Sequence, residues 1–407
     1  MKAPQAPRGT QDILPSEQPY WDLVRSIAAE VAQQYGFQRI ETPIFEETGV
    51  FQRGVGEGTD IVEKEMYTFE DKGGQSLTLR AEGTAPVVRA YLEHGMFKLP
   101  QPVKLFYICP IFRFERPQAG RYRQHHQFGV EALGEIDPGL DAEVIELLWT
   151  FFTRLGLKDF SLQLNSIGDG NCRPRYLEEL KRYYASHLNE VCDDDRVRFQ
   201  KNPLRLLDCK VPSCQSVANG APHTADYLCD DCATHFAALR RNLDLRGLPY
   251  DLNFRLVRGL DYYTKTVFEI VPDGGGQQST IGAGGRYDGL AEQLGGRATP
   301  GIGFGSGIER IILNYKAAHE EELLAPAPDV FLVAAGATER EAATKLSVEL
   351  RGAGLRVATT YSDRGFGAQM KAAGSSRARY AVILGESELA SASAAVKNLS
   401  SGEQETV

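Results

Sequence analysis

The chain has 407 residues and a formal net charge of −9, and 42% of its residues are hydrophobic. This length exceeds one ordinary core and predicts about two or three domains. The acidic balance excludes a protein that coats nucleic acid non-specifically, although a local basic patch can still bind a nucleic acid.

The first predicted elements are an amphipathic helix and a strand. Apolar residues share one helical face over residues 19–35, and Gly36 supplies the stop. Residues 39–45 then have the composition of a strand. Because proline cannot donate to a strand ladder, Pro43 places this strand at an edge or a bend.

Strand and helix signals continue after residue 76. Residues 77–80 predict a short strand and residues 87–92 a helix, with Thr84 well placed as the N-cap and Pro86 in the first turn. Asp141 opens a further helix whose apolar residues predict core rather than function.

The segment 112–131 is the most informative part of the chain. It predicts two strands joined by a short basic loop, so that side chains alternate between two faces. One face carries charged and amide groups, and the aromatic residues Phe112, Phe114 and Phe128 are expected on the buried face. Arginine forks suit phosphate oxygens, but on this segment alone a merely solvated hairpin face stays open as the alternative. The side chains expected on the polar face are Arg113, Glu115, Gln127 and Glu131.

The predicted secondary structure of the second half of the chain changes at two places. Residues 168–249 predict an inserted, mainly helical domain, because they interrupt the strands on either side. Residues 320–328 resemble a proline-bearing linker. Beyond them, strands and helices alternate up to residue 384 and predict a small α/β domain. Residues 403–407 show no packing pattern of their own.

Glycine recurs at every second position from 301 to 307, just before a helical run. A strand face without side chains lets a ligand approach the backbone closely. A dinucleotide-binding loop is excluded because no strand-turn-helix unit with a suitably placed acid follows. Residues 282–286 are not a phosphate-binding P-loop, because no Lys-Ser/Thr pair follows.

These segments carry a resemblance to a known family. The segment 112–131 resembles motif 2 of the class II aminoacyl-tRNA synthetases, and residues 39–45 and 305–311 resemble motifs 1 and 3. Residues 256–263 and 284–290 resemble two peptides specific to the histidyl-tRNA synthetases of the bacterial type. The resemblance runs over essentially the whole chain.

The resemblance implies an α+β catalytic domain with an antiparallel class II synthetase sheet over residues 1–325. A helical insertion at 168–249 interrupts it, and an α/β anticodon-binding domain follows at 329–407. The family works as a homodimer, with the motif 1 proline, here Pro43, at the interface. It usually continues with a short helix, so whether the natural chain extends past Val407 stays open.

The implied reaction is the ligation of histidine to tRNA. ATP, with Mg²⁺, activates L-histidine to histidyl-adenylate and releases pyrophosphate, and the histidine then passes to the 3′ end of tRNA(His) with release of AMP. Such chemistry rests on positioning and on cations around phosphorus.

By the resemblance, Arg113 and Arg258 are the catalytic cations at the α-phosphate, and Arg310 lies at the γ-phosphate and adenine. A single arginine is usually a solvated surface residue, but three in three separate signature peptides indicate a site. His125 stands where the family usually has a phenylalanine stacked on adenine, and an imidazole can also stack there. The candidates for ATP binding are Arg113, Glu115, Arg121, His125 and Arg310, and those for the tRNA acceptor end are Gln118 and Arg123.

Histidine recognition calls for acceptors around the ammonium group and a matched pair around the imidazole. Glu82, Thr84 and Gln127 supply the first by resemblance, and Glu131 accepts from the ring N–H. Tyr263 or Tyr287 pairs with the other ring nitrogen, although a core aromatic with its hydroxyl at the rim is the alternative for a tyrosine. The candidates for histidine binding are Glu82, Gly83, Thr84, Gln127, Glu131, Arg258, Tyr262, Tyr263 and Tyr287.

The seven cysteines, an odd number in a long chain, do not predict a disulfide framework. Cys209, Cys214, Cys229 and Cys232 form a candidate four-thiolate structural zinc site, with free thiols as the alternative. No apolar run approaches the about 20 residues of a membrane span, and residues 1–7 lack the core of a signal peptide. A cytoplasmic protein without a membrane partner is therefore expected.

Two other functions were weighed against this one. A synthetase-like regulatory subunit of histidine biosynthesis usually lacks the C-terminal domain and part of the catalytic set, and this chain has both. A synthetase for another amino acid is disfavoured by the two histidine-specific peptides.

Overall fold

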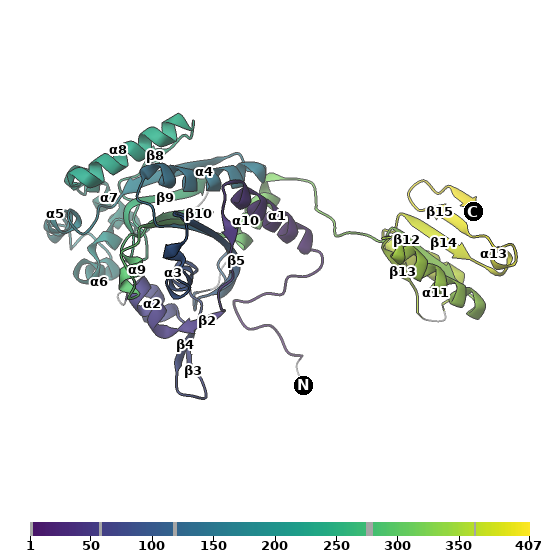
Figure 1. Ribbon diagram of the computed structural model, residues 1–407. Coiled ribbons are helices and arrows are strands. Elements are labelled where there is room, and N and C mark those ends of the chain that lie inside the picture. Colours follow the sequence, from purple (N-terminus) through teal and green to yellow (C-terminus); the bar gives the residue numbers. More distant parts are fainter. Residues whose placement is uncertain (1–2, 57–58, 117–119, 274–279, 362–363) are drawn as a thin grey trace. The chain divides into compact units, whose positions relative to one another are not determined.

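The structure is a computed structural model that describes residues 3–56, 59–116, 120–273, 280–361 and 364–407. It divides into two compact units, Met1–Leu323 and Leu324–Val407, which are described separately (Figure 1). In the described part of the chain, no helix combines the length and the apolar character needed to cross a membrane.

The first unit is built on an eight-stranded sheet whose central strands are antiparallel, as predicted. Only the two edge strands pair in parallel with their neighbours. Strands distant in sequence thereby become neighbours, because β6 pairs with β11 from Gln127 opposite Gly307 to Leu133 opposite Gly301. The strands, in sheet order, are β1 (Gln38–Arg39), β5 (Val103–Phe112), β6 (Gln124–Leu133), β11 (Gly301–Gly307), β10 (Gly282–Arg286), β9 (Thr264–Pro272), β7 (Phe160–Ser166) and β8 (Asp251–Leu252).

Both faces of this sheet are covered, so its strands carry apolar side chains on each side. Phe106 of β5 belongs to one hydrophobic core, while its neighbours Leu105 and Tyr107 belong to the other. Figure 1 shows helices α1, α4 and α8 on one face and α2 and α3 on the other. The helices are α1 (Gln18–Gln34), α2 (Thr48–Val55), α3 (Thr84–Glu93), α4 (Pro138–Arg154), α8 (Asp230–Leu245), α9 (Leu290–Gln293) and α10 (Ile308–Ala318).

Helix α1 ends where the sequence predicts. Gly36 has a φ of +80°, and its N–H donates to the carbonyl of Gln33 at 3.0 Å. A residue without Cβ adopts this left-handed conformation at low cost, so glycine closes the helix.

Helix α4 begins earlier than expected, because the Asp137 carboxylate caps it by accepting from the Gly139 N–H at 2.6 Å. Asp141 is therefore not the first residue but a fully buried anion inside the fold. It accepts from Arg286 at 2.8 Å, from Thr266 at 2.6 Å and pairs with His235 at 2.9 Å. The buried ion pair between Asp141 of α4 and Arg286 of β10 fixes this strand against the helical layer. Strand β10 contains the start of one of the two histidine-specific peptides.

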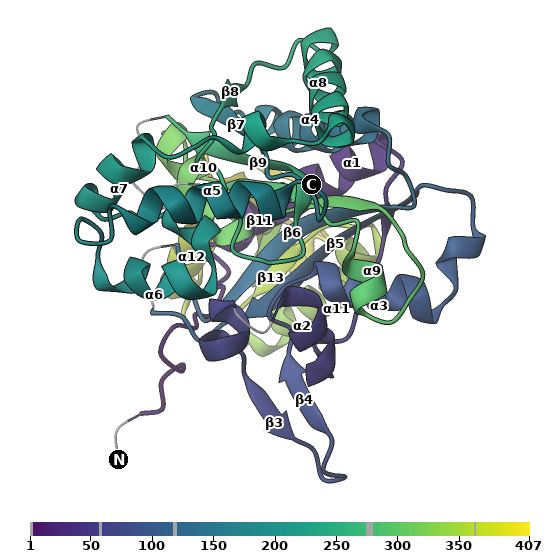
Figure 2. The ribbon, with the colours of Figure 1, turned by 90° about the vertical axis from the view of Figure 1, so that its left-hand side faces the viewer.

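The insertion between β7 and β8 is helical, which confirms the prediction. It contains α5 (Arg173–Ala185), α6 (Asp193–Lys201), α7 (Pro212–Asn219), helix α8 and the 3₁₀ turns Pro203–Leu206 and Thr224–Tyr227 (Figure 2). The buried residues of α5, such as Tyr176 and Leu180, join the same hydrophobic core as Leu105 and Tyr107 of the sheet, whereas those of α8 join the core on the other face. The insertion therefore forms part of the wall on both sides of the sheet.

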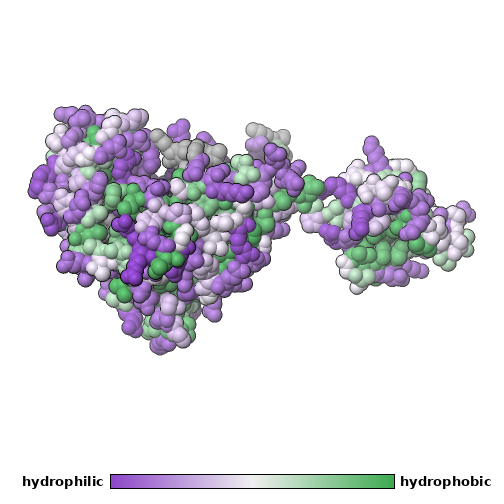
Figure 3. Space-filling view, turned by 90° about the horizontal axis from the view of Figure 1, so that it is seen from above, coloured by the Kyte–Doolittle hydropathy of each residue, from purple (hydrophilic) through white to green (hydrophobic). Residues whose placement is uncertain are grey.

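A small second sheet extends from the first unit. It has the order β2-β4-β3, with β2 (Phe45–Glu47), β4 (Ser76–Leu79) and β3 (Thr68–Glu70). Figure 2 shows β3 and β4 projecting beyond the large sheet. The π-helix Ile61–Glu65 precedes β3. Seen from above, the surface of the first unit mixes hydrophilic and hydrophobic residues without one broad apolar face (Figure 3).

The second unit is the predicted α/β domain, with the strand order β13-β12-β14-β15-β16. Residues 403–407, which show no packing pattern in the sequence, include the edge strand β16, which pairs antiparallel with β15, and the Val407 N–H donates to the Ala394 carbonyl at 2.9 Å. Backbone bonds hold this exposed polar edge strand, so its side chains carry no packing signal. The elements are β12 (Val330–Ala334), α11 (Ala337–Gly352), β13 (Val357–Thr359), α12 (Phe366–Ser375), β14 (Tyr380–Leu384), α13 (Glu386–Ala390), β15 (Ala395–Asn398) and β16 (Gln404–Thr406).

Candidate active site

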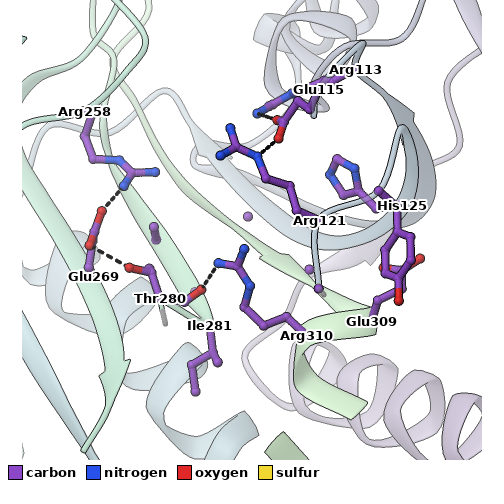
Figure 4. A pocket seen from close by; sticks show the side chains of 16 residues that line it. Arg113, Glu115, Arg121, His125, Arg258, Glu269, Thr280, Ile281, Glu309 and Arg310 are labelled. Carbon is purple, nitrogen blue, oxygen red and sulfur yellow. Dashed lines mark hydrogen bonds and ion pairs between the residues drawn. The ribbon is translucent and has the colours of Figure 1, made fainter. Parts of the chain in front are cut away.

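A cleft beside strands β10 and β11 holds two adjoining cavities of about 300 and 320 Å³. The arginine cavity is lined by Arg113, Arg121, Arg258, Arg310 and His125, among others (Figure 4). The tyrosine cavity is lined by Glu82, Thr84, Gln127, Tyr262 and Tyr263, among others. The residues that line both are Arg113, Glu115, Arg121, His125, Arg258, Ala283 and Gly305.

Thr280 connects the groups that hold Arg258 and Arg310 in the arginine cavity. Arg310 donates to the Thr280 carbonyl at 2.5 Å, while Arg258 pairs with Glu269, whose other oxygen accepts from the Thr280 hydroxyl at 2.9 Å. Figure 4 shows Arg258 facing Arg121 and Arg310 across the cavity. Burial, and then the charge of Arg121, lower the pKa of the Arg310 guanidinium. Crowded cations of this kind favour a bound polyanion.

The hairpin that brings Arg113 here differs from the predicted pair of continuous strands. Strand β5 ends at Phe112, and the Arg113 N–H donates to the Arg123 carbonyl at 2.9 Å. Arg113 and Glu115 still line the cleft, from a turn rather than from strand alternation. Phe114 was expected to be buried but is 50% exposed, because the chain has left the sheet at this point.

Arg123 lies outside both cavities. Its guanidinium stacks 3.9 Å from the centre of the Phe114 ring, and its Nε donates to the Glu115 carbonyl at 3.3 Å. The other residue expected at the tRNA acceptor end, Gln118, falls outside the described residues. Arg121, in contrast, pairs with Glu115 at the cavity wall.

His125 is neutral at neutral pH, because burial, and then the charge of Arg113, lower the pKa of its imidazole to about 3. A neutral ring can lie among these arginines without adding to their mutual repulsion. The neighbouring His126 pairs through Nδ1 with Glu309 at 2.9 Å, which fixes the strand beside the cavity.

The glycines of β11 make room for side chains of the neighbouring strand β6. A Cβ on Gly305 would lie 1.6 Å from Gln127 Nε2, and one on Gly303 would lie 2.0 Å from Glu131 Oε2. Their spacing was expected to open the backbone to a ligand, and Gly305 does line both cavities. The absence of side chains at Gly305 and Gly303 also leaves room for Gln127 and Glu131 to cross the face of β11.

The prediction that Thr84 caps helix α3 was wrong. The helix begins at Thr84, and the Glu82 carboxylate accepts from the N–H groups of Thr84 at 2.8 Å and Ala85 at 2.6 Å. Gly83 lies at the cap, where a Cβ would come within 2.3 Å of the Tyr107 ring. Burial raises the pKa of Glu82. An acidic capping group at a helix start is favourable, and here it also lines the tyrosine cavity.

Glu131 is fully buried behind the wall of the tyrosine cavity. It accepts hydrogen bonds from the hydroxyls of Thr84 at 2.8 Å, Tyr107 at 3.1 Å and Tyr287. Burial raises the pKa of the Glu131 carboxyl to about 8. Glu131 and Tyr287 are absent from the lining of both cavities as described, so they form a second layer behind Thr84.

The cavity itself presents Gln127 and the two adjacent tyrosines. Gln127 Oε1 is buried and has no hydrogen-bond partner in the described part of the chain. The rings of Tyr262 and Tyr263 lie 4.7 Å apart, and the Tyr262 hydroxyl donates to Glu82 at 3.5 Å. An acceptor without a donor beside an open cavity indicates where a ligand donor binds.

Sequence reasoning missed several lining residues. Glu269 is the single acid inside the otherwise apolar end of strand β9, which was a usable signal. Glu309 adjoins Arg310 in the chain and could also have been found. Asp60, Glu65 and Arg205 reach the tyrosine cavity from the π-helix and the insertion, and no local pattern points to them.

The four cysteines expected to form one site are divided between two clusters. Cys209 and Cys214 lie with Cys192 and Asp195, whereas Cys229 and Cys232 lie with Cys172 and Asp169. The single four-thiolate site was therefore wrong. Spacing alone could not separate the pairs, since each is completed by a cysteine and an aspartate from elsewhere in the chain.

Comparisons with known proteins agree with the geometry of the cleft. The family model for histidyl-tRNA synthetase matches residues 9–168 and 210–311, and that for the anticodon binding domain matches residues 329–407. A histidine–tRNA ligase of Dehalococcoides mccartyi (strain CBDB1) is 56% identical over 99% of this chain and 96% of the relative, and one of Moorella thermoacetica is 53% identical over 98% and 95%. The crystal structure of apo histidyl-tRNA synthetase from S. aureus superimposes with a TM-score of 0.83 at 38% identity, covering 100% of this chain and 97% of the other.

Proposed function

Because the chain belongs to the histidyl-tRNA synthetase family, we propose that its two adjoining cavities hold the two reactants of histidine activation. The protein is a histidine–tRNA ligase, which activates L-histidine with ATP and transfers it to the 3′ end of tRNA(His). The arginine cavity takes ATP, and the tyrosine cavity takes histidine.

One observation carries this assignment. Arg113 and Arg258 line both cavities, so an α-phosphate in one and a carboxylate in the other meet between the same two cations. The carboxylate oxygen of histidine attacks the α-phosphorus, and the bond to pyrophosphate breaks. Negative charge grows on the phosphoryl oxygens in this step, and fixed guanidinium groups stabilise it.

The other residues of the arginine cavity position ATP. Arg310 binds the γ-phosphate, Arg121 and Glu115 flank the chain of phosphates, and the neutral imidazole of His125 stacks on adenine. Glu269 acts through Arg258, as a positioning residue that holds the guanidinium. Mg²⁺ enters as part of the ATP substrate, where the phosphates supply most of its oxygen ligands.

Histidine is recognised by groups at two depths. Glu82, Thr84 and the unpartnered Gln127 oxygen accept from its ammonium group, with the backbone at Gly83 alongside. Tyr262 and Tyr263 flank the ring. Behind them lies Glu131, which Tyr287 supports by a hydrogen bond. The N–H of the histidine ring replaces one of the hydroxyls that donate to Glu131. A carboxyl group can accept this bond in either protonation state.

The second step transfers histidine to tRNA. The terminal ribose hydroxyl attacks the carbonyl carbon of the adenylate, and AMP leaves. Arg123, whose guanidinium stacks on Phe114, binds the acceptor end. Gln118, outside the described residues, is the second candidate for this contact by the family resemblance. We assign residues 1–325 to the catalytic domain, interrupted by the insertion at 168–249, and residues 329–407 to anticodon binding.

We also propose a homodimer that forms along the small sheet. A concave surface with a volume of about 710 Å³ runs beside Pro43, and Ile44 and Phe45 next to it are each 50% exposed. Apolar side chains beside a concave surface are typical of a subunit interface. The protein works in the cytoplasm, where ATP and tRNA are available and thiols stay reduced.

The direct test is pyrophosphate exchange into ATP with each of the twenty amino acids in turn. We expect exchange with histidine alone. Exchange with another amino acid would overturn the assignment of the tyrosine cavity, and binding of histidine without any exchange would indicate a regulatory subunit.

A further inference from the structure

Six of the seven cysteines gather in two clusters within the insertion, and each cluster contains three thiols and one carboxylate. We call them the first cluster and the second cluster. The first cluster comprises Asp169, Cys172, Cys229 and Cys232, and the second comprises Cys192, Asp195, Cys209 and Cys214.

In the first cluster, the chain supplies its four groups as two similar pairs. Asp169 and Cys172 are separated by two residues just before α5, and Cys229 and Cys232 have the same spacing at the start of α8. A pair with this spacing turns two side chains toward one point, as the pairs of structural zinc sites do. Cys172 and Cys232 are 5% and 0% exposed, so the centre of the cluster is shielded from water.

The second cluster also has one pair with this spacing, Cys192 and Asp195 at the start of α6. Cys209 and Cys214, with four residues between them, complete it; Cys209 precedes α7 and Cys214 lies in its first turn. Asp195 and Cys214 are fully buried.

The distances between sulfur atoms suit a shared ion rather than a disulfide. Cys192 Sγ lies 3.9 Å from Cys209 Sγ, and the four ligand atoms of each cluster lie within 4.8 Å of one another. Two thiolates on a tetrahedral zinc, each about 2.3 Å from the metal, are about 3.8 Å apart. A disulfide would bring two sulfur atoms to about 2.05 Å.

Asp195 provides an independent indication of a missing cation. One oxygen of its fully buried carboxylate accepts from Arg198 Nη1 at 2.9 Å. The other, Oδ2, has no hydrogen-bond partner in the part of the chain that the structure describes. A buried carboxylate oxygen without a partner is costly, and a cation held by the three neighbouring thiolates would satisfy it.

Backbone N–H groups already support the sulfur atoms. The Cys192 N–H donates to Cys214 Sγ at 3.2 Å, and the Asp169 N–H donates to Cys172 Sγ at 3.4 Å. Hydrogen bonds of this kind orient thiolate ligands and stabilise their charge.

We propose that the insertion binds two Zn²⁺ ions, one in each cluster, each held by three thiolates and one carboxylate. Each thiol releases its proton to water when it binds the ion. Four protein ligands complete a tetrahedral shell and leave no open position, so both ions are structural.

The first cluster has a consequence for the active site. Arg173, the residue after Cys172, donates to the carbonyl of Tyr263 at 2.6 Å and to that of Gly168 at 3.0 Å. Zinc at this cluster therefore fixes the arginine that holds the backbone of the tyrosine cavity. Loss of this ion should raise the KM for histidine more than loss of the ion in the second cluster.

Elemental analysis of the full chain, purified without chelator, tests the proposal. We expect two zinc ions per chain. The double variants Cys209→Ser/Cys214→Ser and Cys229→Ser/Cys232→Ser should each retain one, and the control Cys109→Ala, which alters the seventh cysteine in β5, should retain two. One ion per chain that both double variants lose would restore a single four-thiolate site and overturn the proposal. If elemental analysis finds no metal in the chain, all seven thiols are free and the proposal is overturned as well.

Two further measurements need no cysteine variant, so they test the proposal even if those variants do not fold. Co²⁺ titrated into metal-free full-length chain should reach its thiolate-to-metal absorption end point at two equivalents, and an end point at one or none would contradict the proposal. Asp195→Asn keeps the shape of the side chain but weakens its donor. It should lose one of the two zinc ions to a chelator about tenfold faster or more, while the other stays unchanged. Equal rates for both ions in the variant and the unaltered chain would remove Asp195 from the ligand set.

Discussion

At the scale of single residues, the cleft combines partly buried cations with a fully buried acid. Arg258 reaches both cavities and is held by Glu269, so its charge is fixed before substrate arrives. Glu131 lies one layer deeper and accepts from the hydroxyls of Thr84, Tyr107 and Tyr287. We propose that Arg258 acts on charge at phosphorus and that Glu131 distinguishes the ring of the amino acid.

Arg258→Ala should lower histidine-dependent pyrophosphate exchange by about 100- to 1000-fold, because a fixed donor to a transition state contributes about 3–4 kcal/mol. Histidine binding should change much less, since the ring contacts stay in place. Steady-state kcat and KM in the exchange assay separate the two effects. Arg255→Ala is the matched control, because Arg255 pairs with Asn219 outside both cavities. A near-normal exchange rate for Arg258→Ala would contradict its catalytic role.

Glu131 should make stability depend on pH. Its pKa is raised to about 8 by burial, whereas that of an unfolded glutamate is about 4.3. Between these values the folded chain keeps a proton that the unfolded chain has released, so the free energy of unfolding falls as pH rises and levels off above about 8. In Glu131→Gln this contribution disappears. Thermal unfolding between pH 5 and pH 9 should therefore show a shallower decline for the variant, and parallel curves would disprove the raised pKa.

A second variant tests recognition of the ring. Glu131→Ala should reduce kcat/KM for histidine by about 5- to 150-fold, since a buried ring N–H left without its acceptor costs about 1–3 kcal/mol. The KM for ATP should stay nearly constant. If both substrates bind within about a factor of two of the unaltered chain, Glu131 only supports the fold.

At the scale of elements, the small sheet β2-β4-β3 has exposed apolar side chains next to a concave surface. Phe45 of β2 and Phe69 of β3 are 50% and 43% exposed, although both belong to regular strands. Proline at position 43 interrupts the strand just before β2, so residues 40–44 remain outside the large sheet. Side chains that no element of the same chain covers are available to a second copy.

Phe45→Glu should convert the proposed dimer into a monomer, because it buries a charge in an apolar interface. Sedimentation or light scattering at matched concentration measures the change in mass. Leu245→Glu serves as the control, since Leu245 is 76% exposed at the end of α8. A variant at position 45 that keeps the mass of the unaltered chain would place the interface elsewhere.

At the scale of the whole molecule, the proposed active site and the match to the anticodon binding domain lie in separate compact units. The lining residues of both cavities lie at or before Arg310, within Met1–Leu323. The second unit has its own cores on the two faces of its sheet. Each unit can therefore fold around its own apolar residues.

A chain that ends after Pro328 should keep histidine-dependent pyrophosphate exchange but lose aminoacylation at low tRNA concentration by about 100-fold or more. The physical reason is that a tethered second binding site raises overall affinity by about that factor. The loss should grow with salt, because phosphate contacts weaken. Both activities are compared in the full and shortened chains. A parallel fall of both would show that the second unit supports the dimer or the core, and no fall in either would show that it does not read the anticodon.

Local patterns and the family resemblance were sufficient for the fold class and for naming many residues that line the two cavities. Helix α1 with its terminal glycine, the glycine-bearing strand β11 and the arginines of three signature peptides are each encoded within a few consecutive residues. Periodicity and turn chemistry act at that range, so they can be read without the structure.

Tertiary structure alone decided the contacts between distant segments. It showed that Glu82, rather than Thr84, caps α3, that Glu131 lies behind Thr84, and that Glu269 holds Arg258. It also separated the cysteines into two clusters by bringing Asp169 to Cys229 and Cys192 to Cys214. Such contacts depend on how strands and helices pack across the whole unit, and no spacing along the chain records that packing.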